Sequence, residues 1–183
     1  MPRLFAFLRA INVGGHTVTM DQLRQIFQAA GLKDAETFIA SGNVVFSSKV
    51  IETGKLEQKI EKALEKALGY EVRTFLRTEG ELAAISRYRP FTESARRAAK
   101  TLSVGFLNEP LSAANRKALA ALRTPKDDFH TQGREIYWLC PDGVGGSLIP
   151  NGGMERTLKL RTTFRSVTTV QRLADKYALV TPG

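Results

Sequence analysis

The 183-residue chain contains one cysteine and two histidines, and it has no long hydrophobic run. Its single cysteine, Cys140, cannot form a disulfide within the chain, so the cysteine content does not indicate an oxidising compartment. The apolar run from Leu4 to Leu8 ends at Arg9 and is too short for a signal peptide or a membrane span. We therefore expect a cytoplasmic protein that makes no use of a membrane.

Several familiar catalytic motifs are also missing from the sequence. It contains no P-loop, no G-x-G-x-x-G, no G-x-S-x-G and no H-E-x-x-H. Two histidines and one cysteine do not supply a conventional zinc site, so we expect no metal and no cofactor. Cys140 follows an apolar stretch and is interpreted as a buried small hydrophobe, because a nucleophile would need His16 or His130 as a nearby base.

Positive charge is present in excess. The chain carries 27 Lys and Arg against 18 Asp and Glu, a net charge of +9. Residues 1–90 contribute +3 and residues 91–183 contribute +6. Such a balance favours polyanionic partners, either phosphate-bearing ligands or nucleic acid, although solubility alone is an equally good explanation.

The hydrophobic pattern of the first half predicts the order βαββαβ, which is that of a ferredoxin-like fold. A T-x-x-Q capping box at Thr19 marks the start of the first helix, and Gly69 marks the end of the second. Ser41-Gly42-Asn43 is interpreted as a turn. The expected elements are a strand at 4–8, a helix at 20–30, strands at 36–40 and 44–46, a helix at 56–68 and a strand at 72–76.

The second half nearly repeats this order. We therefore predict an α/β (α+β) protein of two ferredoxin-like βαββαβ-type halves packed closely together. The predicted divisions are 1–78, a helical and basic connector at 79–100, and 101–183, with one compact domain as the alternative. The expected elements are a strand at 102–107, a helix at 112–122, strands at 127–132 and 134–140, a weak helix after residue 153, a strand at 161–165 and a closing helix.

The strands at 4–8, 44–46 and 136–140 are apolar throughout rather than alternating. Strands of this kind are usually covered on both faces. An open sheet that binds RNA should instead alternate and expose aromatic rings, so a base-stacking surface is disfavoured.

One end of the predicted first sheet gathers polar residues. In a ferredoxin-like sheet the end of strand one lies beside the start of strand three, and the first helix begins at the same end. A guanidinium, side-chain amides, a hydroxyl and glycine-rich backbone would then converge as an anion site. The alternative is that the two asparagines only brace their own loops and Arg9 pairs with a carboxylate. The candidate residues are Arg9, Asn12, Gly14, Gly15, Ser41 and Asn43, with Arg165 as an opposing or supporting contact.

Two further segments could contact phosphate. The glycine-rich stretch 143–153 contains Ser147 and could present backbone amides, or it could be a solvent-facing connection. The connector with Arg87, Arg89 and the pair Arg96-Arg97 could contact a phosphate backbone, or it could be a solvated face.

Three segments carry a resemblance to a bacterial family catalogued as domain of unknown function 1697. They are Leu8-Arg9-Ala10-Ile11-Asn12-Val13-Gly14-Gly15, Ser41-Gly42-Asn43-Val44-Val45-Phe46 and Tyr137-Trp138-Leu139. The resemblance covers nearly the whole chain and implies ferredoxin-like elements and a cytosolic setting, with no established activity. This sequence departs from the pattern at Leu148 and at Ser166-Val167.

The hypothesis that follows is a non-enzymatic binding protein for a nucleotide or a nucleic-acid backbone. One alternative is a small transferase or hydrolase acting on a phosphorylated metabolite, with His16 or Asp21 as its base. The other is a structural or homo-oligomeric module without a ligand. The sequence indicates no oligomeric state.

Overall fold

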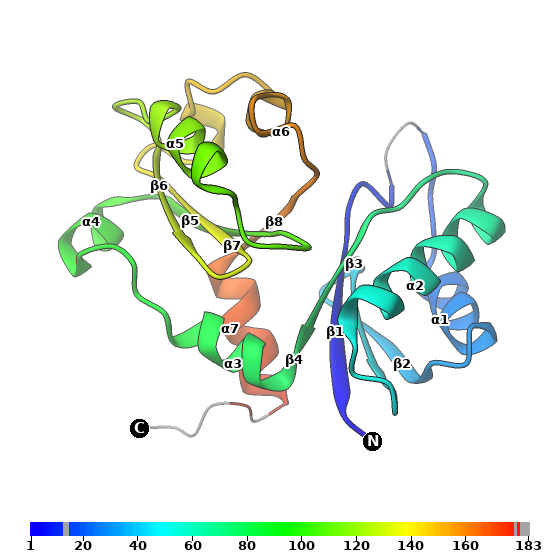
Figure 1. Ribbon diagram of the computed structural model, residues 1–183. Coiled ribbons are helices and arrows are strands. Elements are labelled where there is room, and N and C mark those ends of the chain that lie inside the picture. The colour runs from blue at the N-terminus through cyan, green and yellow to red at the C-terminus, as the bar shows by residue number, and fades with distance from the viewer. Residues whose placement is uncertain (13–14, 178, 180–183) are drawn as a thin grey trace. The chain divides into compact units, whose positions relative to one another are not determined.

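The computed structural model describes residues 1–12, 15–177 and 179, and the chain divides into two compact units (Figure 1). The first unit comprises Met1–Ser86 together with the end of the chain from Gln171. The second unit comprises Arg87–Val170. No helix in the described ranges is long and apolar enough to cross a membrane.

The first unit is built on a four-stranded antiparallel sheet in the order β2-β3-β1-β4. Helices α1 and α2 pack on one face of this sheet (Figure 1). The ferredoxin-like arrangement predicted from the sequence is therefore confirmed. The elements are β1 (Arg3–Leu8), α1 (Met20–Ala29), β2 (Lys33–Phe38), β3 (Ala40–Ser47), α2 (Thr53–Leu68) and β4 (Thr74–Thr78), followed by α3 (Glu79–Arg87).

Local signals set the helix ends of this unit. The Thr19 hydroxyl accepts a hydrogen bond from the backbone N–H of Gln22, and the Gln22 side chain accepts one from the N–H of Thr19. This is the predicted capping box, and it fixes where α1 begins after the loop that leaves β1. Helix α2 ends at Gly69, whose φ of 83° lies in the left-handed region that glycine adopts freely.

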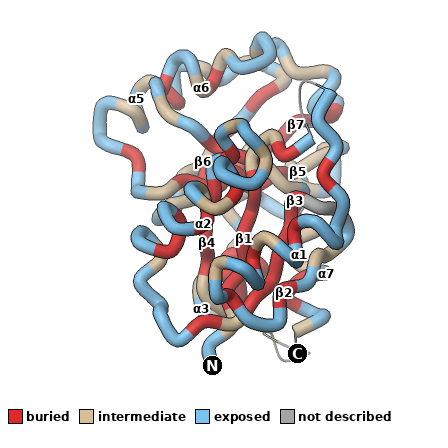
Figure 2. Tube along the Cα trace, turned by 90° about the vertical axis from the view of Figure 1, so that its right-hand side faces the viewer, coloured by how far each residue is buried: buried red, intermediate tan, exposed pale blue. Residues whose placement is uncertain are grey.

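Strand β1 is buried on both faces. Residues Leu4 to Leu8 are at most 2% exposed, and β1 appears red in Figure 2. Alternate residues of the strand belong to the core shared with α1 and α2. Phe5 points to the other face, where its ring meets the edge of Tyr177 at a centroid distance of 5.6 Å. This burial confirms the prediction that an all-apolar strand is covered on both sides.

Helix α2 also covers the edge of β4. Glu57 Oε1 accepts a hydrogen bond from the backbone N–H of Leu76, and Glu61 Oε1 accepts one from the N–H of Thr74, each at 3.0 Å. The two glutamates lie one helical turn apart, so they reach alternate N–H groups of the strand. The backbone N–H groups of Thr74 and Leu76 at the edge of β4 therefore have acceptors. A strand of another chain can no longer pair with them.

The second unit has the same topology, with strand order β6-β7-β5-β8 and helices α5 and α6 packed on one face. Gly105 in β5 is required there, because a Cβ at this position would lie 2.6 Å from the Phe164 ring. Thr92 caps α4. The elements are α4 (Glu93–Ala98), β5 (Thr101–Phe106), α5 (Ala113–Ala121), β6 (Asp128–Gln132), β7 (Glu135–Cys140), the 3-10 turn Val144–Gly146, α6 (Gly153–Leu158) and β8 (Thr163–Ser166). Helix α7 (Val167–Lys176) begins in this unit, and its residues from Gln171 onward belong to the first unit.

The prediction of a turn at Ser41-Gly42-Asn43 is wrong. The chain reverses at Ile39, between β2 and β3, and residues 41–43 belong to β3. Ile39 adopts a left-handed φ of 65° that allows the reversal. β-Branched residues rarely take this conformation, so no turn signal is present in the sequence.

Candidate functional site

The end of β1 lies beside the start of β3, as predicted. In the antiparallel register Phe7 pairs with Asn43, so the chain that leaves β1 at Arg9 passes next to the first residues of β3. Asn12 and Gly15 lie on the loop that follows Arg9 and leads to α1. Gly14 lies outside the described residues, and so does the side chain of Ser41.

Each of the two asparagines braces the backbone at this end of the sheet. Asn12 Oδ1 accepts a hydrogen bond from the backbone N–H of Val18 at 2.9 Å, which closes the loop between them. Asn43 Nδ2 donates to the carbonyl oxygen of Phe38 at 3.1 Å, across the turn between β2 and β3. Asn43 is only 3% exposed, whereas Asn12 is exposed to solvent. Asn12 thus joins two described ends of the loop, Asn43 holds the turn, and Asn12 lies on the accessible side.

Tyr70 anchors the same loop, and the sequence analysis missed it. Its hydroxyl donates to the carbonyl oxygen of Ile11 at 2.6 Å, and its ring stacks on His16 with centroids 4.1 Å apart. Burial raises the pKa of the Tyr70 hydroxyl. The backbone N–H of Arg9 donates to the carbonyl of Arg73 at 2.9 Å. These contacts join residues about 60 positions apart, so no local spacing reveals them.

Two residues with left-handed backbone flank the candidate site. Ala10 has a φ of 56° and follows Arg9 directly, and Ile39 has a φ of 65° in the neighbouring turn. Neither residue is a glycine, and such conformations cost on the order of 1–3 kcal/mol each. Strained residues of this kind concentrate at functional sites, where the surrounding contacts hold them in place.

The family model for "Protein of unknown function (DUF1697)" matches residues 1–137, which is three quarters of the chain. The chain belongs to this family. Conserved bacterial protein SP0830 from Streptococcus pneumoniae has a similar solved structure, with a TM-score of 0.74 and 21% sequence identity. The match covers 97% of this chain and 99% of that one, and at this identity it supports the fold alone. Among curated proteins there is no significant match to the chain.

The catalytic candidates of this DUF1697 protein are engaged in other contacts. His16 is exposed and stacks on Tyr70, and Asp21 is exposed and forms an ion pair with Arg24. Cys140 is fully buried, and burial raises the pKa of its thiol to about 11. A thiol with that pKa is protonated at neutral pH, so Cys140 is a poor nucleophile. The described residues contain no group of three or more His, Cys, Asp or Glu that could hold a metal ion.

Arg165 belongs to the second unit, on β8. Its Nη1 donates to the Thr163 hydroxyl at 2.8 Å and to the carbonyl oxygen of Phe164 at 2.9 Å. Burial lowers the pKa of its guanidinium to about 10, which still leaves the group charged at neutral pH. Arg165 therefore supports its own strand within that unit.

The glycine-rich stretch 143–153 is organised by a carboxylate. Asp127 Oδ1 accepts hydrogen bonds from the Ser147 hydroxyl at 2.5 Å and from Trp138 Nε1 at 2.9 Å. Its Oδ2 accepts from the backbone N–H of Leu148 at 3.0 Å and from the Thr124 hydroxyl at 2.6 Å. Burial raises the pKa of Asp127, but these four bonds together outweigh it and leave the pKa below its ordinary value. The loop already surrounds an anion, which disfavours a phosphate there.

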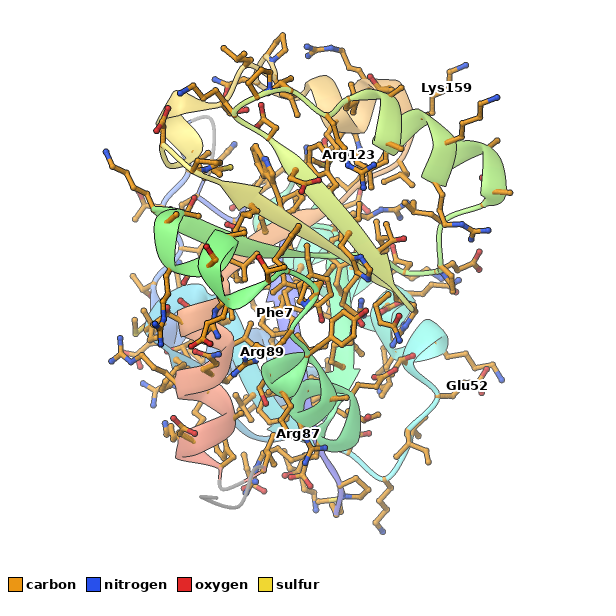
Figure 3. The ribbon with its side chains drawn as sticks, turned by 90° about the vertical axis from the view of Figure 1, so that its left-hand side faces the viewer. Phe7, Glu52, Arg87, Arg89, Arg123 and Lys159 are labelled. Carbon is orange, nitrogen blue, oxygen red and sulfur yellow. The ribbon has the colours of Figure 1, made fainter. Side chains whose placement is uncertain are left out.

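The positive charge is concentrated in the second unit. Its residues include 14 Lys and Arg against 7 Asp and Glu, a net +7, whereas the first unit has 13 against 11, a net +2. Arg87 and Arg89 extend from the end of α3 and the segment after it (Figure 3). Several arginines donate to backbone carbonyls, including Arg116 to Leu111 and Arg134 to Asn108. Part of the basic excess therefore has a structural role.

Proposed function

We propose that this protein binds a phosphate-bearing ligand, a nucleotide or a stretch of nucleic-acid backbone, at the strand ends of its first unit. The observation that carries the proposal is the pairing of Phe7 with Asn43. In this register the end of β1, which leads into Arg9 and Asn12, lies beside the start of β3, which holds Asn43, and we assign these three residues to one site next to two strained backbone positions. A cytoplasmic setting, in which such ligands are abundant, is part of the proposal.

The proposed contacts follow from the chemistry of these side chains. A guanidinium can donate two parallel hydrogen bonds to phosphate oxygens, which is the role proposed for Arg9. The exposed side-chain amide of Asn12 and the backbone N–H groups around Gly14 and Gly15 can donate further bonds, as can the Ser41 hydroxyl.

The proposed role is binding rather than catalysis. His16 and Asp21, the candidate bases, already contact Tyr70 and Arg24. The contacts of Asn12 with Val18 and of Tyr70 with Ile11 hold the described ends of the loop, which favours recognition because less of the chain needs to be ordered when a ligand binds.

Fluorescence anisotropy tests the proposal. The probes are labelled single-stranded and duplex oligonucleotides and a labelled ATP, each titrated with protein at two salt concentrations. Binding of at least one probe should weaken steeply with salt, because phosphate contacts release counterions. Arg9→Ala should raise the Kd about tenfold or more, because it removes a charge-assisted hydrogen-bonded contact.

Arg24→Ala provides the matched control. Arg24 is exposed on α1 and pairs with Asp21, so this variant loses the same charge from the same unit. We expect it to change the Kd less than twofold. Equal effects of Arg9→Ala and Arg24→Ala, or no binding of any probe at low salt, would contradict the proposal.

A further inference from the structure

A cavity lined by lysines, serines and apolar side chains lies at the end of the first unit's sheet opposite to the Arg9 loop. It has a volume of about 320 Å³, and the residues that matter most in its lining are Lys33, Ser47, Ser48, Lys49, Leu56 and Lys59. These residues come from the start of β2, the end of β3 and helix α2. The loop with Arg9 and Asn12 is at the other end of β1, so the two sites are separate. The volume falls at the lower end of the range for small-molecule sites, about 300–1,000 Å³.

The sheet register brings the cavity residues together. Lys33 pairs with Ser47 across β2 and β3, so a lysine and a hydroxyl lie on neighbouring strands. Lys59 reaches the cavity from α2, and its Nζ lies 4.0 Å from the position a Cβ would occupy on Gly31. Gly31 has a φ of 81° in the turn after α1. A glycine is therefore favoured there for its backbone conformation.

The three lysines form no ion pair with any carboxylate of the described residues. Two neighbouring acids are engaged with other groups: Glu52, the residue before α2, pairs with Lys55 at 3.1 Å, and Glu57 on α2 accepts a hydrogen bond from the N–H of Leu76. Three cations of like charge around one cavity repel one another, and a bound anion would relieve that repulsion.

The serine hydroxyls add donors to the same cavity. Ser48 Oγ accepts a hydrogen bond from the backbone N–H of Val50 at 3.1 Å, which orients the oxygen and leaves its hydrogen available. Within the described part of the chain, neither the Ser47 nor the Ser48 hydroxyl donates a hydrogen bond. Part of the cavity lining is apolar, since Leu32 and Leu56 line it and are otherwise buried, each 3% exposed.

We infer that this cavity is a second, independent binding site for a small phosphate ester. The lysines and serine hydroxyls would bind the phosphate dianion, and the leucine wall would contact the carbon skeleton of the ester. The bounded volume favours a small molecule over an extended nucleic-acid strand. The inference does not rest on the proposed function, because it involves no residue of the Arg9 loop.

A two-dimensional ¹H–¹⁵N NMR titration of the full chain with inorganic pyrophosphate and with glucose 6-phosphate tests this inference. Saturable shifts are expected for the backbone amides of Gly31, Lys33 and residues 47–50. The triple variant Lys33→Gln, Lys49→Gln, Lys59→Gln should weaken the apparent affinity at these amides at least tenfold. The control variant Lys55→Gln, Lys62→Gln, Lys66→Gln also removes three positive charges, all from α2 and outside the cavity. It should change the apparent affinity less than twofold.

The outcomes separate the two sites. Saturable shifts at Gly31 and residues 47–50 that disappear only in the first triple variant support the inference. Shifts confined to residues 9–12, 15–18 and 42–43 overturn it while supporting the proposed function. Equal weakening in the two triple variants also overturns it, because the lysines would then act only through net charge. No saturable shift at Gly31 or residues 47–50 with either probe overturns it as well.

Discussion

At the residue scale, Asp127 is the most consequential side chain of the second unit. Its carboxylate accepts four hydrogen bonds, from Ser147, Leu148, Trp138 and Thr124, while it is 2% exposed. Asp127→Asn replaces one acceptor oxygen with an amide that cannot accept these bonds. We expect the free energy of unfolding to fall by about 2–4 kcal/mol, because a buried charged acceptor is lost and donors are left unpaired. Urea unfolding followed by circular dichroism measures this change.

The contribution of Asp127 to the free energy of unfolding should decrease as the pH is lowered. The folded-state pKa of Asp127 is below its ordinary value, so its contribution is present above a pH of about 4 and is lost as the pH falls through the folded pKa. The stability difference between wild type and Asp127→Asn should therefore shrink in acid. Trp138 is the single tryptophan and donates to Asp127, so its fluorescence reports the same titration. A stability difference that stays constant down to pH 2 would contradict this account.

At the element scale, the hydrogen bonds between α2 and β4 supply acceptors for the backbone N–H groups at the edge of the sheet. Glu57 is 5% exposed and accepts from the N–H of Leu76. Glu57→Leu should lower the free energy of unfolding by about 1–3 kcal/mol, because the N–H is left buried without an acceptor. Glu57→Gln keeps an acceptor oxygen and should cost less than about 1 kcal/mol. Equal losses for the two variants in urea unfolding would show that the hydrogen bond to Leu76 is not the cause.

The elements also show what could be predicted from the sequence. Thr19 and Gln22 interact over three residues, and Gly69 ends its helix through its own backbone, so both helix ends were predictable. The unbroken apolar run of β1 indicated burial on both faces, and the element order gave the sheet topology. The turn at Ile39 could not be predicted, because Ile39 adopts a left-handed backbone conformation that isoleucine disfavours.

Some residues of the candidate site follow from the strand order, whereas others make contacts that only the folded chain brings about. Topology alone predicted that the end of β1 lies beside the start of β3, and the pairing of Phe7 with Asn43 agrees with this; the assignment of Arg9 and Asn12 to the site stays a prediction. Tyr70 and Asp127 were missed because each acts on residues distant in sequence or on a loop whose path depends on the fold. The lysine cavity was missed because Lys33, Lys49 and Lys59 share no sequence spacing and meet only through strand pairing and helix packing.

At the scale of the whole molecule, the chain leaves the first unit after Ser86 and returns to it at Gln171. The returning segment is tied to β1 and β2. Tyr177 meets Phe5 edge-on and lies under Arg3 at 4.4 Å, its hydroxyl donates to Glu36, and Lys176 pairs with Glu36 at 3.8 Å. Burial and the Glu36 carboxylate raise the pKa of Tyr177. The end of the chain is thus part of the first unit's structure.

Truncation tests whether residues 171–177 stabilise the first unit. A chain ending at Val170 loses these contacts together with the buried side chain of Leu173, and its free energy of unfolding should fall by at least about 3 kcal/mol. A chain ending at Leu179 keeps them and should stay within about 0.5 kcal/mol of wild type. Thermal and urea unfolding of both chains provide the measurement. Equal stability of the two truncated chains would contradict the assignment of residues 171–177 to the first unit.

The most direct test of phosphate binding at the strand ends is the effect of Asn12→Asp on the Kd. An aspartate oxygen can still accept from the N–H of Val18, so the loop closure is kept while a negative charge enters the site. Anisotropy with the labelled oligonucleotides and labelled ATP should show a Kd raised at least about tenfold, with an unchanged free energy of unfolding. A Kd equal to that of wild type for every probe that binds would contradict the central claim.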